Sequence, residues 1–291
     1  MIKKSIFMMG LSLAITMLAS ENLFGQLSVP APSPTITVKQ GFATSNIELS
    51  YSRPSVRGRV VFGDLVPYDK VWRTGANGAT TIYFGEEVSV GGKKLPKGKY
   101  GLLTIPGKSE WTVILSKDTT VTSPADYKQE NDAVRMKIKP VKLPAMVETF
   151  SIEIANVRTK GDGCDIRIVW ERTMISFTVT ADIDTKIMAQ IDESMKGDKK
   201  PYYQAARYYY ENKKDLRKAL EWADEAVKAR PDAYWIILLK ARIQFDLGDY
   251  DGCIATANQS KEKAKADQND DYVKMNDKLI ADAQKLQLKK K

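Results

Sequence analysis

The spacing of apolar residues changes once along this chain, near residue 182, and this change limits the possible folds more than any other feature. Before it, apolar and polar residues alternate, as in Asp165–Trp170, which is typical of strands with one buried face. After it, residues such as Ile187 and Ile191 recur at the spacing of a helix face. We therefore expect an α+β chain in two domains, with a β-rich part followed by a helical part.

The part before the change, residues 26–181, is expected to be an all-β sandwich. Glycine and proline pairs such as Gly91-Gly92 and Pro106-Gly107 separate its apolar runs. Many short strands joined by frequent turns are typical of two packed antiparallel sheets. The predicted strands cover residues 35–38, 46–52, 80–84, 100–105, 111–115, 133–139, 149–155, 165–170 and 175–180.

The part after the change, residues 182–291, contains an internal repeat. Asp215–Leu220 matches Asp249–Ile254 at a shift of 34 residues, and Ala226 matches Ser260 at the same shift. A 34-residue helix-turn-helix unit with small residues between paired helices is typical of tetratricopeptide repeats.

The similarity to this repeat covers about residues 200–266. Two positions depart from it, because Arg207 and Lys240 stand where small or apolar residues are usual. We expect tetratricopeptide-like hairpins followed by a closing helix over residues 270–288, and such repeats dock a protein partner.

The first 25 residues have the pattern of a secretory signal peptide. Lys3 and Lys4 precede an apolar run over residues 6–18 that is too short to span a bilayer. We expect cleavage before Gln26, no lipid anchor because no cysteine lies nearby, and a periplasmic or secreted protein. After cleavage no stable membrane insertion is expected; an uncleaved anchor is the alternative.

The chain has no histidine among its 291 residues. This excludes Ser-His-Asp and Cys-His catalysis and histidine-containing zinc sites. We expect no metal and no cofactor, and the sequence identifies no catalytic residue.

Cys164 and Cys253 are expected to be buried free thiols. The net charge of +9 is mostly scattered along the chain, so nucleic-acid binding is not expected.

Residues 51–80 contain the densest group of residues suited to holding a ligand. Arginine presents a planar fork that can hold carboxylate or phosphate groups, and nearby glycines let the backbone approach a ligand. We expect a site for a polar or anionic small molecule, or a glycan, at the rim of the sandwich. The candidate ligand-binding residues are Arg53, Arg57, Arg59, Trp72, Arg73, Thr74 and Asn77.

Two other interpretations of this segment remain open. It could be a structural loop whose arginines pair with nearby carboxylates, in a structural envelope component without a ligand. It could also belong to a histidine-independent glycoside hydrolase or lyase that uses the same carboxylates. Those carboxylates are Asp64, Asp69, Glu86 and Glu87.

Three motifs in this segment resemble the bacterial domain-of-unknown-function family 2911. They are Ser52-Arg53-Pro54, Gly58-Arg59 and Trp72–Asn77, within a resemblance over roughly residues 35–181. The resemblance implies a secreted or periplasmic β-rich domain, mostly from Bacteroidetes-type bacteria, with no established activity. Family members often carry a helical, repeat-like tail, as this chain is expected to do.

Overall fold

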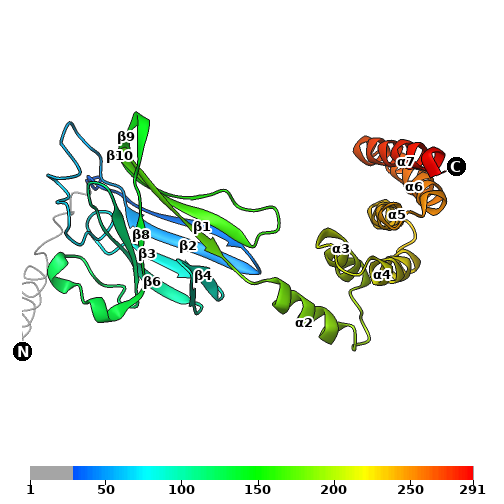
Figure 1. Cartoon of the computed structure of the whole chain (residues 1–291), viewed down its shortest axis with the longest axis horizontal. Coiled ribbons are helices and arrows are strands. Elements are labelled where there is room, and N and C mark those ends of the chain that lie inside the picture. Colours follow the sequence, from blue (N-terminus) through cyan, green and yellow to red (C-terminus); the bar gives the residue numbers. More distant parts are fainter. Residues whose placement is uncertain (1–28, 291) are drawn as a thin grey trace, which may run out of the picture. The chain divides into compact units, whose positions relative to one another are not determined.

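A computed structural model describes residues 29–290, so the signal peptide predicted at residues 1–25 lies outside the described part of the chain. The chain divides into two compact units, Met1–Asp182 and Ile183–Lys291. In Figure 1 the strands, coloured blue to green, belong to the first unit and the helices α2–α7 to the second. Each unit is considered by itself.

The first unit consists of two antiparallel sheets, which confirms the predicted α+β fold class together with the helices that follow. One sheet has the strand order β1-β2-β3-β6-β7-β8 and the other β5-β4-β10-β9. The strands are β1 (Thr35–Phe42), β2 (Ser45–Ser52), β3 (Thr81–Phe84), β4 (Val88–Val90), β5 (Lys93–Leu95), β6 (Gly98–Ile105), β7 (Trp111–Ser116), β8 (Asp132–Ile138), β9 (Val141–Ala155) and β10 (Gly163–Thr180).

Side chains on the inner faces of the two sheets meet in one core. Ile47, Leu49 and Tyr51 alternate along β2 with more exposed residues, and all three are buried. The Tyr51 ring lies 5.7 Å from the Phe150 ring of β9 in an edge-to-face contact. Its hydroxyl also donates a 3.0 Å hydrogen bond to the Ile152 carbonyl, so this residue ties the two sheets together.

Strand β10 corrects the prediction of two separate strands at residues 165–170 and 175–180. The chain continues as one strand because Glu171 takes a φ of 53° between two register shifts, which absorbs the irregularity without ending the strand. Strand β4 was not predicted, because Val88–Val90 is too short to show an alternating pattern.

The second unit is built from consecutive helices. Helix α3 packs on α4, α5 on α6, and α7 on α6 and α5. The helices are α2 (Asp184–Ser194), α3 (Tyr202–Glu211), α4 (Leu216–Ala229), α5 (Tyr234–Leu247), α6 (Tyr250–Ala266) and α7 (Asp270–Lys290). No helix in residues 29–290 is long and apolar enough to cross a membrane.

The 34-residue shift relates equivalent structural positions in the helical unit. The Asp215 carboxylate caps α4 by accepting from the backbone N–H of Lys218 at 3.1 Å, and Asp249 caps α6 by accepting from Gly252 at 2.9 Å. Ala219 and Cys253, one shift apart, are both fully buried. Ala226 and Ser260, also one shift apart, are likewise buried where helices pack.

Both cysteines are buried free thiols, Cys164 in the β unit and Cys253 in the helical unit. Burial raises the pKa of each thiol to about 11. Neither is therefore ionised near neutral pH, and neither has the low pKa of a reactive thiolate.

Candidate functional site

A cavity of about 400 Å³ in the β unit borders the long loop between β2 and β3. Its walls come from four parts of the chain: the segment before β1, this loop, the segment after β7, and β10. The lining residues are Ser33, Pro54, Arg59, Leu65, Val66, Pro67, Lys70, Val71, Trp72, Arg73, Gly75, Ala76, Thr122, Pro124 and Trp170.

Trp72 is held in the cavity wall by the backbone of β6. Its N–H donates to the Thr104 carbonyl at 2.7 Å, and the Thr104 N–H donates back at 3.0 Å. The Trp72 indole N–H is satisfied by the Gly75 carbonyl at 3.0 Å. The ring stacks on Trp170, with centroids 5.8 Å apart and planes 18° apart. Trp170 is only 2% exposed, so the half-buried Trp72 supplies most of the indole surface of the cavity.

Thr74 and Asn77 shape the loop but do not line the cavity. Both take a left-handed backbone conformation with φ of 56°. The Thr74 side chain is fully buried, with its hydroxyl 3.0 Å from the Thr104 hydroxyl. The Asn77 amide donates to the Ser33 carbonyl at 3.0 Å, which fixes the segment before β1 against the loop.

Arg53 and Arg57 also hold the loop and lie outside the cavity lining. The Arg53 guanidinium donates to the Phe150 carbonyl at 3.1 Å and to the Ser151 hydroxyl at 2.9 Å. The Arg57 guanidinium donates to the Pro32 carbonyl at 3.0 Å. These two arginines fasten the loop to β9 and to the segment before β1.

Arg59, Lys70 and Arg73 contribute positive charge to the cavity lining. The Arg59 guanidinium donates to the Ser55 carbonyl at 2.8 Å, and that of Arg73 donates to the Thr122 carbonyl. The Arg73 Nε is buried without a hydrogen-bond partner, which is unusual for a donor of this strength. Lys70 is exposed, and its ammonium forms no hydrogen bond or ion pair with the described residues.

Among the residues that the structure describes, the cavity lining contains no carboxylate. The loop carboxylates Asp64 and Asp69 are not part of it, and neither are Glu86 and Glu87. Asp126 follows the wall residue Pro124, and its hydrogen bonds from Ser123 and Thr122 lower its pKa. This carboxylate accepts three hydrogen bonds within its own turn, from the side chain of Thr122 and from the backbone and side chain of Ser123.

The alternative in which the loop arginines pair with nearby carboxylates differs from the structure. Within residues 29–290, the guanidinium groups of all four arginines donate to backbone carbonyls, with one further bond to a hydroxyl. Carbonyl oxygens at the ends of strands and turns are available acceptors, and a planar fork can reach two of them at once. The loop is therefore ordered without neutralising its arginines.

The structure brings three of the seven predicted site residues, Arg59, Trp72 and Arg73, to one cavity. It also adds Lys70 and Trp170, which the sequence did not indicate. Lys70 lies inside the same loop and could have been noticed as a fifth basic residue there. Trp170 comes from β10, about a hundred residues away, and no local pattern connects it to the loop.

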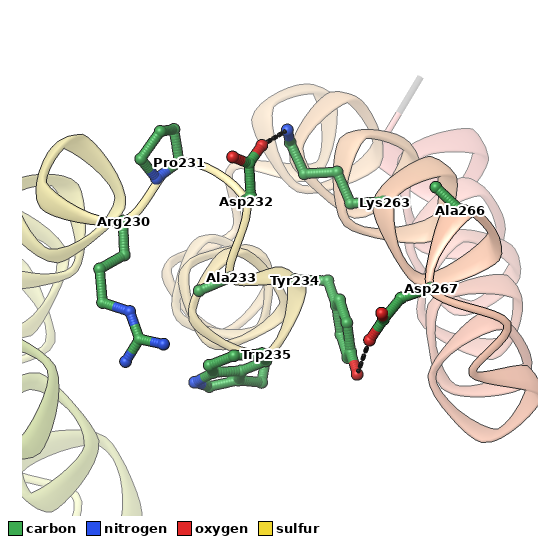
Figure 2. Close-up of a pocket in the computed structure, with 9 residues that line it drawn as sticks. All are labelled: Arg230, Pro231, Asp232, Ala233, Tyr234, Trp235, Lys263, Ala266 and Asp267. Atoms are coloured by element: carbon green, nitrogen blue, oxygen red, sulfur yellow. Dashed lines mark hydrogen bonds and ion pairs between the residues drawn. The ribbon is translucent and has the colours of Figure 1, made fainter.

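A second cavity, of about 660 Å³, lies in the helical unit (Figure 2). The Arg230 guanidinium stands 5.0 Å from the Trp235 ring, a cation–π distance. Beside them Lys263 pairs with Asp232 at 2.6 Å, and the Tyr234 hydroxyl lies 3.0 Å from an Asp267 oxygen. The cavity thus combines two aromatic rings with charges of both signs, at the start of α5 and the end of α6.

Comparison with protein families identifies the family to which the β unit belongs. The sequence model of a family described as "Protein of unknown function (DUF2911)" matches residues 33–179, just over half of the chain. The chain belongs to the DUF2911 family. Every residue that lines the β-unit cavity, from Ser33 to Trp170, falls inside the DUF2911 match. No curated protein and no solved structure matches the chain.

Proposed function

We propose that this DUF2911 protein is a binding module of the bacterial envelope, which holds a polar or anionic small molecule in its β-unit cavity. One observation carries the proposal: the lining places Arg59, Lys70 and Arg73 around a cavity of about 400 Å³ without a carboxylate. Cavities of about 300–1,000 Å³ with a few polar groups on an apolar lining are typical of small-molecule sites. The location rests on the N-terminal signal pattern, and the protein is periplasmic or secreted.

The histidine-independent enzyme remains a weaker proposal. A glycoside hydrolase of the usual kind needs two carboxyl groups facing one cleft, about 5–10 Å apart. The lining of the cavity beside the loop arginines supplies none. Arginine, tryptophan and small polar groups hold ligands more readily than they transform them, which favours binding.

A thermal-shift screen of the chain from residue 26 onward tests the proposal. The screen uses anionic metabolites, glycans and inorganic anions, and a ligand of the cavity is expected to raise the melting temperature of the wild-type protein. Arg73→Ala removes a lining cation and should abolish the shift. Arg57→Ala is the matched control, because Arg57 also donates to a backbone carbonyl but does not line the cavity.

Two results would count against binding in this cavity. One is that no compound shifts the melting temperature of the wild-type chain. The other is that Arg73→Ala responds to a ligand as the wild type does.

The helical unit is proposed to be tetratricopeptide-like and to dock a protein partner. The second cavity supports this, because a half-buried tryptophan, Trp235, beside charges of both signs is typical of protein-binding surfaces (Figure 2). Co-purification from envelope extracts tests it: a partner held here should be lost with Trp235→Ala and kept with Lys285→Ala, an exposed position on α7. Equal recovery with both variants would contradict docking at this cavity.

A further inference from the structure

The β-unit cavity has two chemically different kinds of wall. Of its three charged residues, Lys70 and Arg73 are adjacent to Val71 and Trp72 in the same stretch of chain, and Arg59 is the third. The apolar residues of the lining outnumber the charged ones. They are Pro54, Leu65, Val66, Pro67, Val71, Trp72, Ala76, Pro124 and Trp170. A ligand that matches this cavity must therefore satisfy both a positive charge and an apolar surface.

Neutral sugars match the lining poorly. Each sugar hydroxyl both donates and accepts hydrogen bonds, so it needs acceptors as well as donors from the protein. Among the described lining side chains the uncharged polar groups are the hydroxyls of Ser33 and Thr122 and the two indole N–H groups, which already donate to backbone carbonyls; there is no carboxylate or carboxamide. The Thr122 hydroxyl already donates to Asp126.

Small inorganic anions match only one wall. Phosphate or sulfate would pair with the cations but leave the indole and aliphatic surfaces facing water. Burial of apolar area contributes about 25 cal/mol per Å², so a ligand with an apolar body gains affinity that a bare anion does not.

We propose that the cavity binds an amphipathic organic acid, whose single anionic head pairs with Lys70 and Arg73 and whose apolar body lies against Leu65 and Trp72. This inference rests on the proposed binding function and names its ligand class. The head is recognised by charge and by the planar fork of Arg73, and the body by the indole of Trp72, which stacks on the buried Trp170, and by the aliphatic side chains beside it.

Matched probes measure separately how the charged wall and the apolar wall contribute to ligand affinity. Isothermal titration calorimetry would compare 2-naphthoate with 2-naphthalenemethanol, which has the same ring system without the charge, and with inorganic phosphate and maltose. We expect naphthoate to bind at least about tenfold more tightly than the alcohol, because hydrogen bonds to charged groups contribute about 1.5–3 kcal/mol. We expect phosphate and maltose to bind more weakly than naphthoate.

Lys70 on the charged wall and Leu65 on the apolar wall are both exposed, so each can be replaced without disturbing the buried core. Lys70→Gln should weaken naphthoate about fivefold, the upper end for one exposed ionic contact, and leave the alcohol unchanged. Lys39→Gln, an exposed lysine on β1 outside the lining, should change neither. Leu65→Gln should weaken both ring compounds about fourfold, the factor for one buried methylene. Val60→Gln is its control, because Val60 is more exposed and does not line the cavity.

The outcomes distinguish the amphipathic-ligand inference from the proposed binding function on which it rests. Equal affinity for naphthoate and the alcohol, or an unchanged naphthoate affinity in Lys70→Gln, overturns the claim that the cavity recognises an anionic head group. Tighter binding of phosphate or maltose than of naphthoate overturns the amphipathic ligand and leaves the binding function standing. If no probe binds and the thermal-shift screen also finds nothing, both the inference and the proposed function fail.

Discussion

Thr74 and Thr104 place two hydroxyls 3.0 Å apart inside the β unit, and both side chains are fully buried. Replacing Thr74 by valine keeps the shape but leaves the Thr104 hydroxyl without this partner. We expect Thr74→Val to lower the free energy of unfolding by about 1–3 kcal/mol, the cost of a buried unsatisfied polar group. The double variant with Thr104→Val should lose less than Thr74→Val alone, measured by urea unfolding. A double variant as unstable as the sum of the single ones would contradict the pairing.

The two buried thiols give a second prediction at the residue scale. Because burial raises the pKa of Cys164 and Cys253 to about 11, Ellman's reagent should modify neither in the folded protein at pH 8 and both after denaturation. Rapid modification of either thiol in the native chain would contradict their burial.

The same pKa values set the direction of a pH dependence. Below pH 9 the thiols hold their protons in both the folded and the unfolded chain, so the two buried thiols make their full contribution to the free energy of unfolding. Between about pH 9 and 11 the unfolded chain releases its thiol protons first, so stability is lost as the pH rises. A variant with Cys164→Ala and Cys253→Ala should lose less stability over this range than the wild type does.

Residue types alone predicted part of the candidate site. The arginine-rich loop with its tryptophan led to Arg59, Trp72 and Arg73, because these residues combine charge and ring surface within one segment. The same reasoning also selected Arg53 and Asn77, which fasten the loop to other segments. A guanidinium that binds a backbone carbonyl and one that faces a cavity have the same sequence signal, and only tertiary structure separates them.

At the scale of elements, the two aspartate caps make comparable contributions at equivalent positions. Asp215→Ala should destabilise α4, and Asp249→Ala should destabilise α6, each by about 1 kcal/mol, since an N-cap carboxylate satisfies otherwise unpaired N–H groups. The measurement is chemical unfolding followed by circular dichroism at 222 nm. Asp215→Asn and Asp249→Asn keep an acceptor and serve as controls; a loss as large as with alanine would contradict capping.

Element boundaries were predictable where a pattern ran over several residues. The 34-residue match placed a repeat unit at Asp215–Leu220, and helix α4 begins there at Leu216. Strand β10 was predicted in two pieces because its polar residues near Glu171 interrupt the alternation, and a bulge cannot be told from a turn in sequence alone. The short strand β4 gave no pattern because three residues show too little periodicity.

At the scale of the whole molecule, the division at Asp182 and Ile183 predicts separable unfolding. Thermal unfolding should show two transitions, because each unit has its own buried core. Asp249→Ala should shift only the transition seen at 222 nm, and Thr74→Val only the transition of the β unit. Coincident shifts of both transitions by either variant would contradict independent folding of the two units.

The carbonyl bonds of the loop arginines have a consequence for the conditions under which the cavity persists. A guanidinium stays protonated at any pH a folded protein meets, and a backbone carbonyl oxygen does not titrate. The bonds from Arg53 to Phe150, from Arg59 to Ser55 and from Arg73 to Thr122 therefore lack a partner that acid could neutralise. We expect these three contacts to persist in acid, whereas protonation of Glu148 would weaken the 2.8 Å bond that its carboxylate accepts from the Arg57 backbone N–H.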